Sequence, residues 1–266
     1  MTKIIGILNL TMDSFSDGGM YFDLKSAKRH VSEMIEQGTD VIDIGAESTR
    51  SGFSDVDENS QIKTLTPIIK FIQDNYTIDI SIDTRSSKVA NAFSDMHISF
   101  INDVSSGTHD INMLKTVSKI GCNYIMTHMP EEHQKGLNMS YDDIIEELQR
   151  FFDNRIKACL SEGIQKDKII IDPGIGFGKS GKDNITILEN IDSLLKLHNK
   201  VCIGTSNKRF SSSLFKGIET KDDLKVANVA TATLCAINGA TYLRVHDVGI
   251  TKDSVLIVNQ VKSIKT

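Results

Sequence analysis

A run of three isoleucines that ends in a charged, glycine-rich loop constrains the fold of this 266-residue chain more than any other feature. The segment from Ile169 to Lys179 reads IIIDPGIGFGK. A continuous apolar run is typical of a strand that is buried on both faces, as in a parallel sheet. Asp172 then lies at the carboxyl end of this strand, where the glycines would let a ligand come close to the backbone. The alternative is a simple turn in which Asp172 caps the next helix.

Short apolar segments alternate with amphipathic segments along the whole chain. The apolar segments predict eight strands, at Lys3–Asn9, Val41–Ile44, Ile80–Asp83, Phe100–Asp103, Asn123–Met126, Ile169–Asp172, Val201–Gly204 and Tyr242–Val245. Apolar residues that recur every three or four positions predict the helices between them. These helices are expected at 24–37, around 62–72, at 86–95, 110–120, 141–162, 184–197 and 221–238, and from about Asp253 onward.

This order of elements predicts a (β/α)₈ TIM barrel, a fold whose usual length is about 250 residues. We expect residues 1–266 to form a single domain, because no stretch of the sequence has the composition of a linker. A doubly wound open sheet is the alternative. The barrel is favoured because polar residues follow nearly every predicted strand, and a barrel gathers the carboxyl ends of its strands at one mouth.

Charge and hydropathy exclude several classes of protein. The formal net charge of −5 argues against a nucleic-acid-binding surface, which would need clustered Lys and Arg to neutralise phosphates. The apolar start of the chain is too short to span a bilayer and lacks a cleavage site, so we expect a cytoplasmic protein with no membrane partner. The four cysteines are far apart and lie in apolar segments, which predicts buried thiols and no metal site.

The polar residues after the predicted strands are the candidates for a functional site. In chain order they are Asn9; Glu47, Ser48, Thr49 and Arg50; Asp83; Asn102 and Asp103; His128; Asp172; Ser206 and Lys208; and Arg244 and His246. His128 either lines the mouth or is a hydrogen-bonded structural histidine. His198, on a predicted helix, is expected to be solvated.

The candidates divide by their chemistry. One group combines carboxylates, an amide and an ammonium, and suits a flat heterocycle that presents several N–H donors and a carbonyl oxygen. Its members are Asp83, Asn102, Asp172 and Lys208. The cationic group of Arg50, Arg244 and His246 suits an anion. Asn9 offers a neutral oxygen of the kind that Mg²⁺ accepts.

Seven motifs in a fixed order make the chain resemble the dihydropteroate synthases. They are NLTMDSFSDGG, DIGAESTRSG, SIDT, IND, DPGIGFGK, SNKRF and RVHDV, and the resemblance extends from Lys3 to Val248. It implies a (β/α)₈ transferase of folate biosynthesis, a sulfonamide target, that condenses 6-hydroxymethyl-7,8-dihydropterin diphosphate with 4-aminobenzoate and releases pyrophosphate. It also implies Mg²⁺ as cofactor and a homodimer formed through the later helices.

The resemblance implies a role for each matching residue. The pterin ring would be held by Asp83, Asn102, Asp172 and Lys208. Of these, Asp83, Asp172 and Lys208 would also be catalytic. The diphosphate would be met by Asn9, Arg50, Arg244 and His246, with Asn9 binding the metal. The aminobenzoate would lie near Thr49, Phe177, Ser206 and Lys208.

Three positions depart from the usual pattern of that family. Met12 and Ser51 stand where prolines are usual, and Asn207 stands where an arginine is usual. These departures keep open a pterin-binding paralogue with little or no synthase turnover. A third candidate, a corrinoid-dependent methyltransferase with the same barrel, would not need the anion-binding residues of RVHDV, so that motif counts against it.

Overall fold

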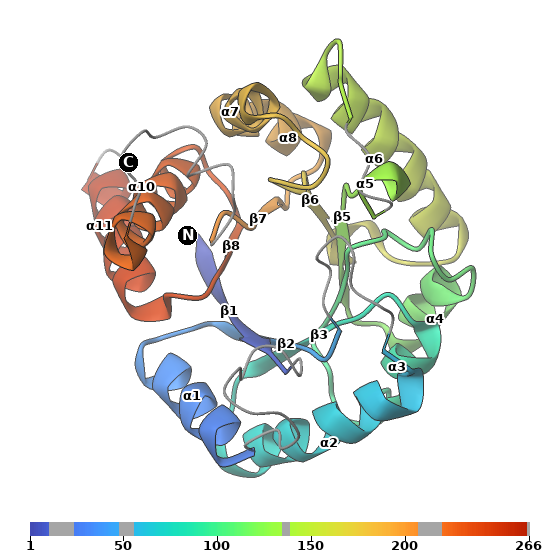
Figure 1. Cartoon of the computed structure of the whole chain (residues 1–266). Coiled ribbons are helices and arrows are strands. Elements are labelled where there is room, and N and C mark those ends of the chain that lie inside the picture. The colour runs from blue at the N-terminus through green and yellow to red at the C-terminus, as the bar shows by residue number, and fades with distance from the viewer. Residues whose placement is uncertain (11–23, 48–55, 135–138, 207–219, 265–266) are drawn as a thin grey trace.

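The computed structural model describes residues 1–10, 24–47, 56–134, 139–206 and 220–264, and in these residues eight parallel strands are surrounded by helices (Figure 1). The strands are β1 (Lys3–Asn9), β2 (Val41–Gly45), β3 (Asp79–Asp83), β4 (Phe100–Asp103), β5 (Asn123–Thr127), β6 (Ile169–Asp172), β7 (Cys202–Ile203) and β8 (Tyr242–Val245).

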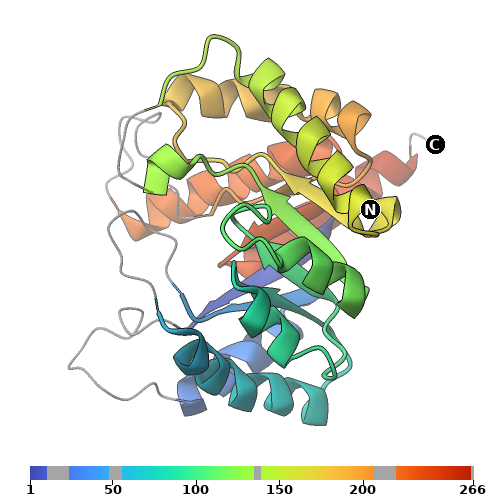
Figure 2. The ribbon, with the colours of Figure 1, turned by 90° about the vertical axis from the view of Figure 1, so that its right-hand side faces the viewer.

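Helices follow the strands along the chain and lie on the outside of the sheet, as the side view of Figure 2 shows. They are α1 (Leu24–Glu36), α2 (Glu58–Asn75), α3 (Ser87–Ala92), α4 (Met113–Ile120), α5 (Glu131–Gln134), α6 (Ile144–Ser161), α7 (Gly181–Glu189), α8 (Ile191–Leu197), α10 (Lys221–Ile237) and α11 (Val248–Ile264). In α1, for example, Ala27, Val31 and Met34 recur every three or four residues and are buried, so one stripe of the helix faces the sheet.

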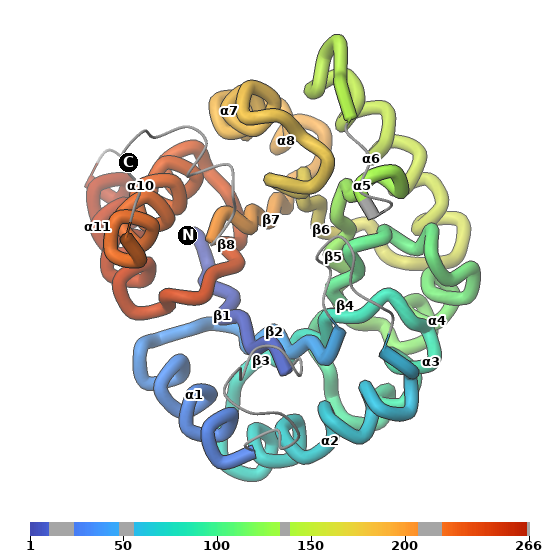
Figure 3. Tube along the Cα trace, viewed as in Figure 1, coloured from blue at the N-terminus to red at the C-terminus, as the bar shows by residue number. Residues whose placement is uncertain are grey.

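The strands are neighbours in the order in which they occur in the sequence. The hydrogen-bonded order is β6-β5-β4-β3-β2-β1-β8-β7, so the first strand pairs with the last, and Ile5 lies opposite Arg244. The chain trace in Figure 3 shows β1 and β8 side by side. A bridge between Ile171 of β6 and Val201, next to β7, joins the two ends of the sheet. The predicted (β/α)₈ barrel is therefore confirmed, and the doubly wound open sheet is wrong.

An apolar layer fills the inside of the barrel below its mouth. It consists of Ile5, Val41, Phe100, Ile125, Ile170, Cys202 and Tyr242, which form a cluster separate from the larger core between strands and helices. Side chains on a strand alternate between its two faces, so residues two positions further along point to the same side. These next inward residues include Asp43, Asn102, Asp172 and Arg244. A polar layer therefore lies directly on the apolar one.

Several predicted element boundaries were wrong. The helix expected at 184–197 is two helices, because the backbone of Asn190 leaves the helical region at φ −116° and ψ 32° and its side chain donates to the Thr186 carbonyl oxygen (2.7 Å). The last helix begins at Val248 and not near Asp253, since the fully buried Val248 packs under its first turn. The short helix α5 was not predicted. His198 is buried and not solvated, and its Nε2 lies 2.7 Å from the Ile169 carbonyl oxygen.

Candidate active site

The carboxyl ends of the strands bring together most of the residues that the sequence singled out. Asn9, Asp83, Asn102 and Asp172 are the last or next-to-last residues of their strands, Arg244 lies near the end of β8, and Ser206 and His246 follow β7 and β8. Phe177 lies in the loop after β6 and is half-buried. Thr49, Arg50 and Lys208 lie outside the described residues, as do Met12, Ser51 and Asn207.

A buried charge centre forms the floor of the mouth. The guanidinium of Arg244 donates from Nε to Asp43 Oδ2 and from Nη2 to Asp83 Oδ2, both at 2.6 Å. Asn102 Nδ2 donates to the same Asp43 Oδ2 at 3.1 Å. Strands β2 and β3 therefore bond one arginine of β8 directly, and β4 joins them through Asp43. Gly45 makes this possible, because a Cβ at that position would lie only 3.2 Å from the Cβ of Asp83.

The charge centre combines the carboxyl groups of Asp43 and Asp83 with one guanidinium. Burial raises the pKa of Asp83 to about 7, and the Asp43, Asp103 and Glu47 carboxylates add to the rise, while Arg244 opposes it. The carboxylates also raise the pKa of Arg244, so the guanidinium stays charged. Near neutral pH, Asp83 is therefore able to serve as a hydrogen-bond acceptor or, when protonated, as a donor.

Asp172 ends β6 as predicted, and its side chain is tied to the loop that follows. Gly174 donates its backbone N–H to Asp172 Oδ1 at 2.8 Å. Gly174 has a φ of +67°, and a Cβ there would lie 2.2 Å from the carbonyl oxygen of His128. The glycine is thus needed for a close approach, but at this position the partner is the chain itself and not a ligand.

The lysine of the DPGIGFGK motif has a structural role. Lys179 Nζ donates to the carbonyl oxygens of His128, Gly174 and Phe177, each at 3.0 Å. The bond to His128 fastens the loop after β6 to the loop after β5, and the other two hold the loop after β6 together. The sequence showed this lysine as part of a motif but gave no sign that its ammonium holds backbone carbonyls.

His128 is buried, but the hydrogen-bonded ring that one of the two alternatives expected is not seen at Nδ1, which has no partner among the described residues. Burial lowers its pKa to about 2, so the ring is neutral. It packs edge-on against Phe151, with ring centroids 4.7 Å apart. Its backbone N–H donates to the Asp172 carbonyl oxygen at 2.9 Å.

Ser206 and His246 form a pair at the ends of β7 and β8. The Ser206 hydroxyl lies 3.1 Å from His246 Nδ1 and accepts from the His246 backbone N–H at 3.3 Å. The serine therefore fixes the direction of the imidazole ring. Ser206 was expected beside an aminobenzoate, and its contact with His246 was not predicted.

Glu47 and Arg85 are a further pair that the sequence did not predict. Arg85 Nε donates to Glu47 Oε2 at 3.0 Å, and both side chains are largely buried. Glu47 Oε1 also accepts from the backbone N–H of Val56 at 3.3 Å. One carboxylate thus links the residues on both sides of the 48–55 segment to β3.

Within the described ranges, no group of three or more His, Cys, Asp or Glu side chains is placed to hold a metal ion. The four cysteines are buried and unpaired, as predicted. Among the described helices, none combines the length and the apolar character that crossing a bilayer requires.

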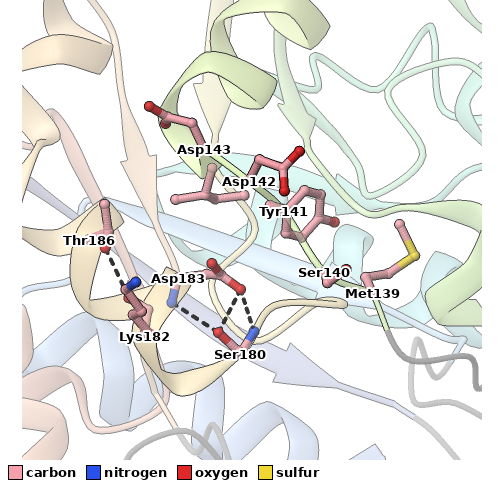
Figure 4. A pocket seen from close by; sticks show the side chains of 10 residues that line it. Met139, Ser140, Tyr141, Asp142, Asp143, Ser180, Lys182, Asp183 and Thr186 are labelled. Atoms are coloured by element: carbon pink, nitrogen blue, oxygen red, sulfur yellow. Dashed lines mark hydrogen bonds between the residues drawn. The ribbon is translucent and has the colours of Figure 1, made fainter.

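A polar pocket outside the barrel is not a second candidate for the functional site. It lies between the starts of α6 and α7 (Figure 4). Its acidic side chains are used to begin helices: Asp143 accepts from Ile145 and Glu146 N–H groups, and Ser180 and Asp183 cap α7 reciprocally. The pocket is therefore explained by helix capping.

Comparison with known proteins identifies the family. The family model described as "Pterin binding enzyme" matches residues 5–246. The dihydropteroate synthase of Streptococcus pyogenes serotype M6 is 36% identical over 257 residues, which cover 97% of this chain and 94% of that protein. A mitochondrial folate synthesis bifunctional protein of Arabidopsis thaliana is also 36% identical, over 93% of this chain and 47% of that protein.

Solved structures agree with the sequence comparison. The dihydropteroate synthase of Xanthomonas albilineans with 4-aminobenzoic acid has a TM-score of 0.90 and 34% identity, and the match covers 98% of this chain and 93% of that chain. The same enzyme in complex with 7,8-dihydropteroate has a TM-score of 0.87 and 33% identity, with 98% and 94% covered. The fold, the strand-end residues and both comparisons lead to one conclusion: the chain belongs to the pterin binding enzymes and, among them, to the dihydropteroate synthases.

Proposed function

We propose that the mouth of this barrel performs the synthase reaction with the pterin held on the floor by Asp83, Asn102, Asp172 and Lys208. The reaction of the family condenses 6-hydroxymethyl-7,8-dihydropterin diphosphate with 4-aminobenzoate and releases pyrophosphate. The observation that carries the proposal is the polar layer of the partly buried Asp83 and the buried Asn102 and Asp172 over an apolar one. Acceptor oxygens above an apolar layer suit the N–H edge of a flat heterocycle.

The leaving diphosphate would be met by Asn9, Arg50, Arg244 and His246. Two of the three guanidinium nitrogens of Arg244 are bonded to carboxylates, and the third, Nη1, has no partner among the described residues. That nitrogen is available to a phosphate oxygen. Loss of pyrophosphate develops negative charge on the leaving oxygens, and cations fixed near them stabilise it.

Mg²⁺ fits this site only if the substrate supplies most of the ligands. Asn9 is exposed at the end of β1 and offers an amide oxygen, and the described residues provide no acidic cluster beside it. Mg²⁺ commonly keeps water molecules and binds substrate phosphates together with one or two protein oxygens. Bound there, the ion would neutralise charge on the departing diphosphate.

The amine of aminobenzoate would then attack the pterin methylene directly. A carboxylate at Asp172 would stabilise positive charge on the ring, and no nucleophilic side chain is required. The aminobenzoate itself would lie near Thr49, Phe177, Ser206 and Lys208. Phe177 supports this part of the proposal because its ring is half-buried in the loop beside Asp172.

We propose that the protein forms a homodimer through α10 and α11. Among the described residues, eight of the thirteen exposed large apolar side chains are on these two helices: Val226, Leu234, Ile237, Ile250, Leu256, Ile257, Val261 and Ile264. The two helices lie side by side outside β8 (Figure 1). An apolar face of this kind, on two adjacent helices, suits a second copy of the same face.

Two further proposals concern location and domain structure. The unpaired buried thiols fit a reducing compartment, which supports the cytoplasmic location. The proposal that residues 1–266 form one domain is supported by a contact between α11 and the residue before β2. Lys252 Nζ donates to Asp40 Oδ2 at 3.0 Å.

One assay tests the proposed reaction. The purified protein is incubated with the pterin diphosphate, 4-aminobenzoate and Mg²⁺, and pyrophosphate and dihydropteroate are measured together. We expect the two products in equal amounts, and their loss in excess chelator. Pterin binding without either product would contradict the proposal and favour the paralogue without turnover, while full activity in chelator would contradict the role of Mg²⁺.

A further inference from the structure

Asp43 is the one member of the buried charge centre that the proposed function does not use. It lies in the middle of β2 and is fully buried, with 0% of its surface exposed. Its position is one inward layer below Gly45 at the mouth. A ligand that enters from the mouth therefore cannot touch its carboxylate, so any influence on the reaction has to act through its neighbours.

Two of those neighbours are proposed ligand contacts. Asp43 Oδ2 accepts from Arg244 Nε at 2.6 Å and from Asn102 Nδ2 at 3.1 Å. Its other oxygen, Oδ1, is buried and has no hydrogen-bond partner among the described residues. Burying a carboxylate with only these partners costs free energy, since charge is stabilised inside a protein only by pairing and hydrogen bonds.

Asp43 Oδ2 already accepts a hydrogen bond from Arg244 Nε at 2.6 Å, and this acceptor fixes the orientation of the Asn102 amide. The NH₂ group must face Asp43, because the reverse orientation would place two oxygens against each other. The amide oxygen Oδ1, which accepts no bond from the described residues, then faces the mouth. Asn102 therefore presents an acceptor, and not a donor, to whatever binds above it.

The same carboxylate fixes Arg244. The bond to Nε, together with the bond from Nη2 to Asp83, holds the planar guanidinium at two of its nitrogens. A guanidinium held in this way has one orientation, and Nη1 has one direction. Asp43 thus sets the geometry of one proposed pterin contact and one proposed diphosphate contact at once.

We propose that Asp43 is a positioning residue for pterin recognition, which orients the Asn102 amide oxygen toward the pterin N–H groups and fixes the Arg244 guanidinium. This inference rests on the proposed pterin site. Through Asp43, β2 would help the site to select a ring edge that carries hydrogen-bond donors, although Asp43 itself does not contact the ligand.

The first test is the binding of 6-hydroxymethylpterin, followed by its fluorescence, to Asp43→Asn. The amide that replaces the carboxylate is able to donate, so the Asn102 amide is no longer held in one orientation. We expect the Kd of the pterin to rise about 10- to 100-fold, the range for losing or reversing a buried hydrogen bond. The kcat/KM for the pterin diphosphate should fall by a similar factor, and the KM for aminobenzoate at saturating pterin should not change.

Ser81→Ala is the matched control. Ser81 is the register partner of Asp43 on β3, is fully buried, and its hydroxyl has no hydrogen-bond partner among the described residues. We expect unchanged pterin affinity in this variant. Asp172→Asn separates the two hypotheses: if it weakens pterin binding and Asp43→Asn does not, the inference about Asp43 is wrong, and if neither does, the proposed pterin site itself is wrong.

The second test does not depend on a variant at position 43 that folds. The side-chain NH₂ of Asn102 is followed by ¹⁵N NMR in the wild-type protein and assigned by its disappearance in Asn102→Ala. We expect its protons to exchange slowly with water and its signal to move little when 6-hydroxymethylpterin is added, because Asp43 holds it below the ligand. Fast exchange, or a large shift on binding, would show the NH₂ group facing the mouth and would overturn the proposal.

Discussion

The raised pKa of Asp83 gives a prediction about stability that is independent of any substrate. Burial raises this pKa from the ordinary 3.8 to about 7, so folding favours the protonated carboxyl. A group of this kind contributes its full stability below about pH 4, and the contribution is lost as the pH rises through about 7. We therefore expect Asp83 to make the protein less stable at pH 8 than at pH 4.

The size of the effect follows from the two pKa values. The interval between 3.8 and about 7 corresponds to about 4 kcal/mol, at about 1.36 kcal/mol for each pH unit. Asp83→Asn removes the titration and keeps the shape of the protonated acid. Arg244 retains its bond to Asp43 in this variant. Relative to wild type, Asp83→Asn should gain up to about 4 kcal/mol in the free energy of unfolding between pH 4 and pH 8.

The assay is urea unfolding of both proteins at several pH values from 4 to 8.5, because urea does not screen charges. Asp79→Asn is the matched control, since it makes the same change of charge at the exposed start of the same strand. The free energy of unfolding of Asp79→Asn should change with pH in the same way as that of the wild type. If the Asp83→Asn curve also runs parallel, Asp83 is ionised throughout, the attraction of Arg244 outweighs burial, and our reasoning is refuted.

Three other predictions concern the site, its loop and the dimer. Asp172→Asn should lower turnover at least about 100-fold with little change in melting temperature, as expected for a charge aimed at the reacting ring; near wild-type turnover would remove Asp172 from the mechanism. Gly174→Ala should lower the free energy of unfolding by more than about 2 kcal/mol, because its Cβ would meet a carbonyl oxygen at 2.2 Å. Gly121→Ala is the control, because Gly121 has a similar φ of +74° but a Cβ there would have no atom within 4 Å. If both variants lose the same free energy of unfolding, the contact of the Gly174→Ala Cβ with the carbonyl oxygen is not the cause. Ile257→Asp should convert the dimer to a monomer in light scattering, whereas Ile111→Asp, with 93% of Ile111 exposed on another face, should not.

The sequence predicted the barrel and the site residues that end strands, because both depend on local patterns. Asp172 and Asn102 follow apolar runs, so their position at the mouth could be read from the chain. Asp43 could not be found in this way. It lies inside a strand, and alternation does not say which of the two faces points into the barrel or that an arginine 201 residues away lies against it.

Other differences have similar physical causes. The break at Asn190 depends on a side chain that bonds the preceding turn, and periodicity alone does not register such a bond. His198 was predicted on a solvated helix face, but it directly follows α8 and its ring lies against the carbonyl oxygen of Ile169 on β6. The roles of Thr49, Arg50 and Lys208 stay predictions, because they lie outside the described residues.

The pairing of the first strand with the last has a consequence for how the enzyme is made. During synthesis, β1 and the carboxylates of Asp43 and Asp83 emerge long before β8, and Arg244 is 201 and 161 residues further along the chain. The neutralising cation is thus synthesised only after the seven other strands. Until it is made, Asp43 and Asp83 lack their cationic partner, Asp43 has only the Asn102 amide, and the barrel has an open edge at β1. We therefore expect the barrel to close and its polar floor to be completed in the same late step of folding, which no fragment that ends before β8 is able to reach.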